Sequence, residues 1–110
     1  MGVLKTVYIS IGNSDDKLTQ VEWAAFQMLA MSTVGIAAEQ VHGRWYSSPS
    51  AKFQNACICA EIDEENVEYL RESLADLAYR YRQDSIAWAE VPVTEFIVPR
   101  SPRDPDSGAE

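Results

Sequence analysis

The stretch that decides the fold is residues 53–81, FQNACICAEIDEENVEYLRESLADLAYRY, in which two hydrophobic periodicities follow one another. From Phe53 to Ile62, apolar residues alternate with others, which is the period of two typical of a half-buried strand. Asp63 is a typical helix N-cap, and two glutamates follow it where they complement the helix dipole. The stretch therefore predicts a strand that runs directly into an amphipathic helix. The apolar side of this helix carries Val67, Leu70, Leu74, Leu77, Ala78 and Tyr81.

The same two periodicities predict four further elements on either side of this stretch. Thr19 and Glu22 match a capping box, which places the start of a first helix near Thr19. This helix is expected to end near Val34, because Gly35 suits the left-handed conformation that stops many helices. Period-two alternation predicts three more strands, at Val3–Ile11, Gln40–Ser47 and Ser85–Val91.

The resulting order, strand-helix-strand-strand-helix-strand, is that of the ferredoxin-like α+β plait. We expect a four-stranded antiparallel sheet with the first and third strands in the centre, because these carry the Val and Ile runs. Both helices then cover one sheet face. A single domain is predicted over residues 1–98, with Val93–Val98 extended again after Pro92. The proline-rich residues 99–110 are predicted to be a disordered polar tail.

The sheet face that no helix covers is the candidate functional surface. Tyrosine and cysteine make it amphipathic, and such faces usually meet a second copy, a partner or a ligand. In the second strand, Val41 and Trp45 are expected to share the other side. The facing of the fourth strand stays open, because Ile86 and Trp88 lie on one side of it. The predicted interaction face comprises Tyr8, Ser10, His42, Arg44, Tyr46, Cys57, Cys59, Glu61 and, if it turns that way, Trp88.

Composition excludes several classes of function. The chain has 110 residues, a net charge of −8 and only nine Lys and Arg, so nucleic-acid binding is not expected. No apolar run reaches the roughly 20 residues that a membrane helix needs. Two cysteines and the absence of a signal-like N-terminus favour a reducing cytoplasm.

Two small clusters of residues are candidate chemical sites. Cys57 and Cys59 on one side of a strand, with His42 on a neighbouring strand, suggest a metal or a Cys/His nucleophile. A structural zinc site normally needs four ligands and a nucleophile needs an orienting group, so small packed side chains are the favoured interpretation. Asp15 and Asp16 could hold a hard cation, but a turn leading into a helix explains them better. We therefore expect no metal and no cofactor, and an enzyme is less favoured than a binding protein.

Three segments carry a resemblance to a known group of proteins. These are Tyr8–Gln20, His42-Gly43 with Trp45–Pro49, and Tyr81–Trp88. Together they resemble small accessory proteins of actinobacterial phages and their hosts, over most of residues 1–98. The group has no established activity, so no residue role is carried over. The resemblance implies a phage-derived protein that works in the bacterial host cytoplasm and binds host proteins.

Two functions remain from the sequence. The first is a non-enzymatic interaction module, a homodimer or a binder of a host protein, that uses the open sheet face. The second is a dimeric α/β-barrel enzyme or small-ligand binder, in which paired sheets enclose a pocket. That pocket would be lined by Tyr8, His42, Arg44, Tyr46 and Cys57.

Overall fold

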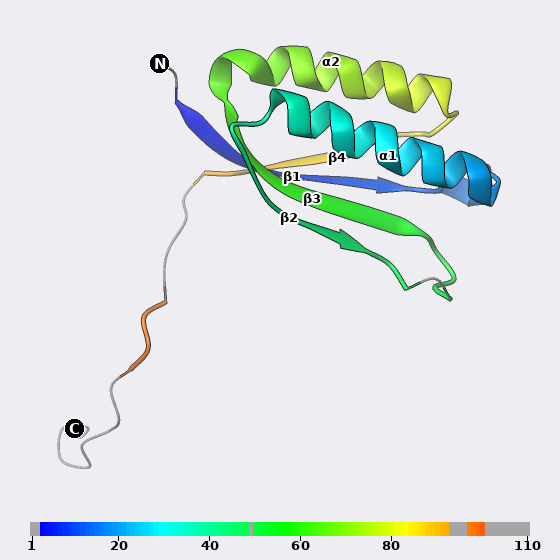
Figure 1. Ribbon diagram of the computed structural model, residues 1–110, viewed down its shortest axis with the longest axis horizontal. Coiled ribbons are helices and arrows are strands. Elements are labelled where there is room, and N and C mark those ends of the chain that lie inside the picture. The colour runs from blue at the N-terminus through cyan, green and yellow to red at the C-terminus, as the bar shows by residue number, and fades with distance from the viewer. Residues whose placement is uncertain (1–2, 49, 93–96, 101–110) are drawn as a thin grey trace.

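A four-stranded sheet with two helices on one face makes up the domain (Figure 1). The computed structural model describes residues 3–48, 50–92 and 97–100. Its strands are β1 (Leu4–Gly12), β2 (Gln40–Tyr46), β3 (Asn55–Asp63) and β4 (Ala87–Val91). Its helices are α1 (Gln20–Ala37) and α2 (Glu64–Arg80), with a short 3-10 turn, η1 (Ser14–Asp16), ahead of α1.

The sheet has the strand order β2-β3-β1-β4, and every neighbouring pair is antiparallel. This is the predicted ferredoxin-like plait. The apolar strands β1 and β3 lie in the centre, where Val7 is paired with Ala60 and Ile9 with Ile58. Because residues directly opposite each other share a face, one register places all the alternating apolar residues of both strands under the helices.

The core lies between the sheet and the helices. Val7, Ile58 and Ile62 of the sheet are fully or almost fully buried, as are Phe26 of α1 and Leu70 of α2. Each such side chain contributes about 1.5–3 kcal/mol relative to an exposed one. Two aromatic pairs strengthen the α1 side, with ring centroids 6.1 Å apart for Trp23 and Phe26 and 5.1 Å apart for Phe26 and Tyr81.

The first helix is longer than predicted. Its capping box is formed, with the Thr19 side chain accepting from the Glu22 amide at 3.1 Å and Glu22 accepting from the Thr19 amide at 3.0 Å. The prediction that Gly35 ends the helix is wrong, because the helix continues through Gly35 to Ala37. Gly35 does not have a positive φ, so it does not act as a left-handed stop. The helix ends instead where Ala38 becomes extended.

The connection between β1 and α1 is a hydrogen-bonded turn. Asp15 and Asp16 have left-handed backbone angles, with φ of 53° and 55°. The Asn13 side chain accepts from the Leu18 amide at 2.9 Å and donates to the Leu18 carbonyl at 3.1 Å. The buried Gln83 side chain accepts from the Ser14 amide at 2.8 Å. These hydrogen bonds stabilise the tight turn that contains the two aspartates, which indicates a structural role for both.

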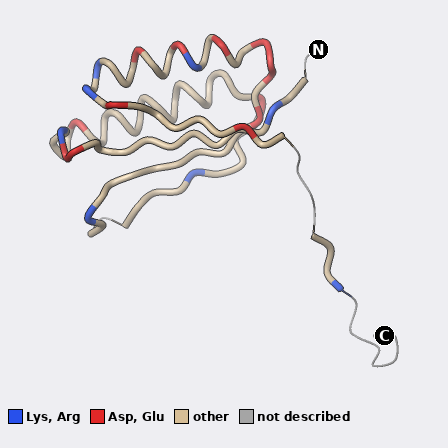
Figure 2. The backbone as a smooth tube through the Cα atoms, turned by 180° about the vertical axis from the view of Figure 1, so that it is seen from behind, with Lys and Arg blue, Asp and Glu red and all other residues tan. Residues whose placement is uncertain are grey.

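Charge is distributed unequally over the two helices. Figure 2 shows acidic residues along α2, whereas α1 is almost entirely uncharged. Glu22 is the single charged residue of α1, and Val21, Met28 and Ile36 on its outer side are 81%, 64% and 87% exposed. Neither helix combines the length and the apolar character needed to cross a membrane.

The predicted extended stretch Val93–Val98 falls mostly outside the described residues, as does the predicted tail beyond residue 100. Only Ile97 and Val98 of that stretch are described, and they are 98% and 75% exposed. Figure 1 shows the orange segment that contains them apart from the rest of the domain.

Candidate functional site

The sheet face away from the helices is the predicted interaction face, and cross-strand pairing defines which side chains lie on it. Tyr8 is opposite Cys59 on one side and Ala89 on the other, while Ser10 is opposite Cys57 and Ala87. The centre of the face is therefore built mainly from small side chains, from which Tyr8 projects. The open face consists of Thr6, Tyr8, Ser10, Gly43, Trp45, Cys57, Cys59, Glu61, Ala87, Ala89 and Val91.

A β-bulge in β2 changes the predicted membership of this face. Val41 pairs with Ala60 but Gly43 pairs with Cys59, so His42 is an extra residue between them. One extra residue reverses the facing of everything beyond it, because side chains alternate with a period of two. Arg44 and Tyr46 are consequently opposite Ile58 and Ala56, on the helix side. Their assignment to the open face is wrong.

Trp45 takes the place on the open face that the sequence pattern gave to Tyr46. It is opposite Cys57, and 54% of it is exposed. Its indole lies over Gly43, since a Cβ at Gly43 would be only 3.0 Å from Cη2 of Trp45. This is the arrangement in which an aromatic ring covers a strand glycine. An isolated glycine inside a strand pattern is itself a sign of a bulge, so Gly43 was the signal that could have found Trp45.

Tyr8 and Cys59 form the chemical centre of the face. Cys59 is buried and Tyr8 is 43% exposed. Hydrogen bonding with the Cys59 side chain, and next the electrostatic interaction with the same side chain, raise the pKa of Tyr8. The pKa of the Tyr8 phenol therefore lies above its ordinary value of 10.0.

His42 of the outer strand β2 is paired with Glu61, near the end of the central strand β3, with the His42 Nε2 atom 3.3 Å from Oε2 of Glu61. Both side chains are about one-third exposed (38% and 31%). Among residues 3–48, 50–92 and 97–100, no three His, Cys, Asp or Glu side chains come together as a set able to hold a metal ion.

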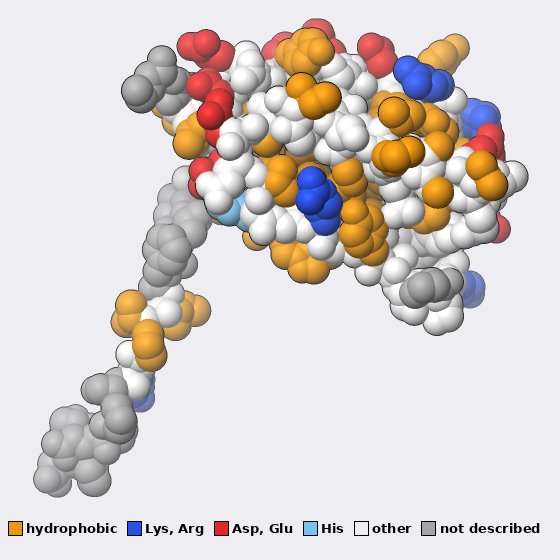
Figure 3. Space-filling model, viewed as in Figure 1, with side chains coloured by type: hydrophobic (Ala, Val, Ile, Leu, Met, Phe, Trp, Pro, Cys, Tyr) orange, Lys and Arg blue, Asp and Glu red, His pale blue; other side chains and the backbone are white. Residues whose placement is uncertain are grey.

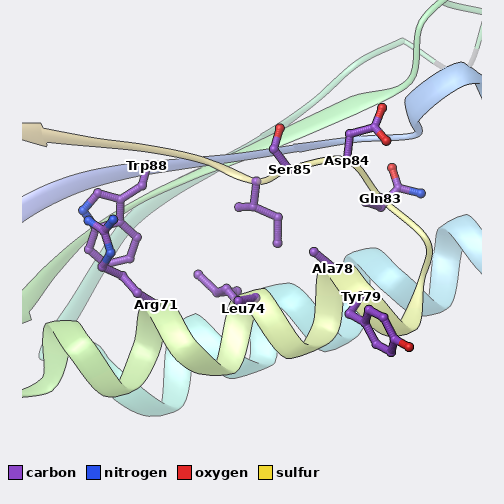
Figure 4. Close-up of a pocket in the computed structure, with 10 residues that line it drawn as sticks. Arg71, Leu74, Ala78, Tyr79, Gln83, Asp84, Ser85 and Trp88 are labelled. Atoms are coloured by element: carbon purple, nitrogen blue, oxygen red, sulfur yellow. The ribbon is translucent and has the colours of Figure 1, made fainter.

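Trp88 does not belong to the open face. It is opposite Ile9, on the helix side, and it packs against the core. The Arg71 guanidinium lies 5.3 Å from the centre of its ring, and its indole N–H donates to Glu90 at 3.0 Å. Arg71, Leu74 and Trp88 line a groove of about 350 Å³ at the β4 edge. Figure 4 shows the Arg71 side chain reaching from α2 to the Trp88 ring.

Comparison with known proteins shows the fold alone. The chain matches no protein-family model, and no curated protein is significantly similar to it. A dimeric ferredoxin-like protein of unknown function from Thermobifida fusca is similar in structure, with a TM-score of 0.53 and 11% identity over 84% of this chain and 93% of that one. A DUF3240 family protein from Shewanella baltica has a TM-score of 0.52 and 9% identity over 91% of this chain and 100% of that one.

Proposed function

We propose that this protein is a non-enzymatic self-association module, in which two copies pair their open sheet faces. The observation that carries the proposal is the composition of that face. Tyr8 and Trp45 project, 43% and 54% exposed, from a floor of small and uncharged side chains. Exposed apolar surface of this kind is typical of an interface. The protein from Thermobifida fusca that is similar in fold is dimeric, which supports self-association of this chain but does not specify the surface used.

The edges of the face agree with this proposal. The His42–Glu61 pair lies toward the end of the sheet where β3 leads into α2, outside the area formed by Tyr8, Ser10 and Trp45. Interfaces commonly have such an uncharged centre and a polar rim. A phage-derived protein in a host cytoplasm remains part of the proposal, on the strength of the resemblance in its sequence.

The ligand-binding alternative loses part of its predicted site. Arg44 and Tyr46, two of the five side chains expected to line a pocket between paired sheets, face the helices. The small side chains in the middle of the face also favour close contact between two sheets over an enclosed cavity.

Sedimentation velocity over a range of concentrations tests the proposal. We expect the full chain to sediment as a dimer and Trp45→Asp as a monomer, because the substitution places a charge inside the paired faces. Tyr69→Asp is the matched control, since Tyr69 is an exposed aromatic residue on α2, 67% exposed. Far-UV circular dichroism checks that both variants fold. A wild-type chain that stays monomeric at every concentration would refute the proposal, as would a dimer that Trp45→Asp leaves intact.

A further inference from the structure

A second apolar surface lies on the helix side, between α1 and β2. Met28, Met31 and Ile36 of α1 and Tyr46 of β2 line a groove of about 600 Å³, with Arg44 as its charged residue. Ile36 is 87% and Tyr46 56% exposed. Figure 3 shows hydrophobic side chains gathered on this side of the molecule. Methionine side chains adapt to irregular partners, so such a groove is suited to an extended apolar segment.

The groove borders a free strand edge. β2 is the outer strand of the sheet, and within the described part of the chain it pairs with β3 alone. The peptide groups on its other edge can hydrogen-bond to an added strand. An added strand would also point alternate side chains toward α1, because side chains alternate across a sheet.

The chain itself carries an exposed apolar segment. Ile97 and Val98 are 98% and 75% exposed. In Figure 1 the orange segment that contains them lies apart from the sheet and the helices. The sequence places one charged residue, Glu95, between Val93 and Val98, and its sign is opposite to that of Arg44.

The area of the sheet favours an additional contact in the dimer. Each strand residue covers about 16 Å² of a sheet, 3.4 Å along the strand by 4.8 Å across it. The thirty strand residues of β1 to β4 therefore span roughly 490 Å². This small footprint means that a further contact at the β2 edge would add to the roughly 800 Å² of accessible surface per partner that a stable interface usually buries.

We propose that Ile97 and Val98 of one copy dock at the β2 edge of a second copy, with their side chains in its α1–β2 groove. This inference rests on the proposed self-association. It assigns the groove one occupant, a second copy of this chain, and it gives the uncharged outer side of α1 a function. The groove at the β4 edge is smaller, and Arg71 already lies over Trp88 there.

Amide hydrogen exchange of residues 43–46, measured on the full chain, tests the docking. In the dimer we expect the amides of this stretch that point away from β3 to exchange at least tenfold more slowly in the wild type than in the double variant Ile97→Ser/Val98→Ser. We expect the double variant to fold, because both side chains are largely exposed in the single chain, 98% for Ile97 and 75% for Val98. Arg100→Ser, in the same segment, is the matched control and should exchange like the wild type. Dilution to the monomer should remove the protection.

The alternatives give different results. Equal exchange in the wild type and the double-serine variant, with both sedimenting as dimers, would overturn the docking and leave the proposed function standing. Protection that persists after dilution to the monomer would show that the segment folds back on its own chain, which overturns the second copy as occupant. A wild-type chain that is monomeric at every concentration would overturn the proposed function and this inference together.

Discussion

Replacing Gly43 by alanine should lower the stability of the wild type but raise the stability of a chain that lacks the Trp45 indole. A Cβ atom at Gly43 would lie 3.0 Å from Cη2 and 3.2 Å from Cζ2 of the Trp45 indole, so the ring must move. Gly43 does not have a positive φ, so alanine introduces no backbone strain there. The sign of the effect then depends on whether the ring is present.

The magnitude follows from the covered part of the ring. Trp45 is 54% exposed, so slightly less than half of it is in contact. A fully covered aromatic side chain buries roughly 200 Å². The covered part is then about 90 Å², which contributes about 2 kcal/mol at about 25 cal/mol per Å². Displacing the ring would lose this contribution. Replacing glycine by alanine also stabilises the folded state by about 0.4–1 kcal/mol, because alanine restricts the unfolded chain.

We therefore expect Gly43→Ala to destabilise the wild type by about 1 kcal/mol and to stabilise a Trp45→Ala background by about 0.4–1 kcal/mol. The coupling energy of this double-mutant cycle is then roughly 1.5–2 kcal/mol. Urea denaturation followed by circular dichroism, at a concentration where the chain is monomeric, measures all four proteins.

Gly35→Ala supplies the control for the glycine substitution itself. Nothing lies within 4 Å of a Cβ at Gly35, which is inside α1. It should stabilise both backgrounds by about 0.5–1 kcal/mol. If Gly43→Ala behaves in the same way, stabilising the chain equally with and without Trp45, the indole does not cover Gly43 and the bulge-dependent register of β2 is incorrect.

Two further predictions concern titration. Cys59→Ala should lower the pKa of Tyr8 toward 10.0, because Cys59 is the main cause of its increase; ultraviolet absorbance of phenolate in alkali measures this, and an unchanged Tyr8 pKa would contradict the pairing. The pKa of Glu22 is lowered from 4.5, first by the Thr19 amide and then by Arg82. The Glu22 carboxylate therefore stabilises the folded chain fully above pH 4.5, and this stabilisation is lost as the pH falls through the lowered pKa. The stability difference between wild type and Glu22→Gln, measured by urea denaturation, should therefore shrink below pH 4.5, and a difference that is constant with pH would show that the Glu22 charge has no part in it.

Local signals in the sequence determined the elements and their order. The alternation of β1 and β3, the Thr19–Glu22 capping box and the Asp63 cap each depend on neighbours within a few residues, so the chain alone specifies them. The order of these elements then restricted the fold to one plait, and the apolar runs placed β1 and β3 in its centre.

Tertiary structure decided the membership of the open face. The bulge at His42 exists because Gly43, and not His42, pairs with Cys59, and this pairing joins segments that are distant in sequence. A single unpaired residue reversed the facing of Arg44, Trp45 and Tyr46, since a strand's side chains alternate with a period of two. The facing of Trp88 was likewise set by its partner Ile9 in β1, for which the sequence of β4 holds no local signal.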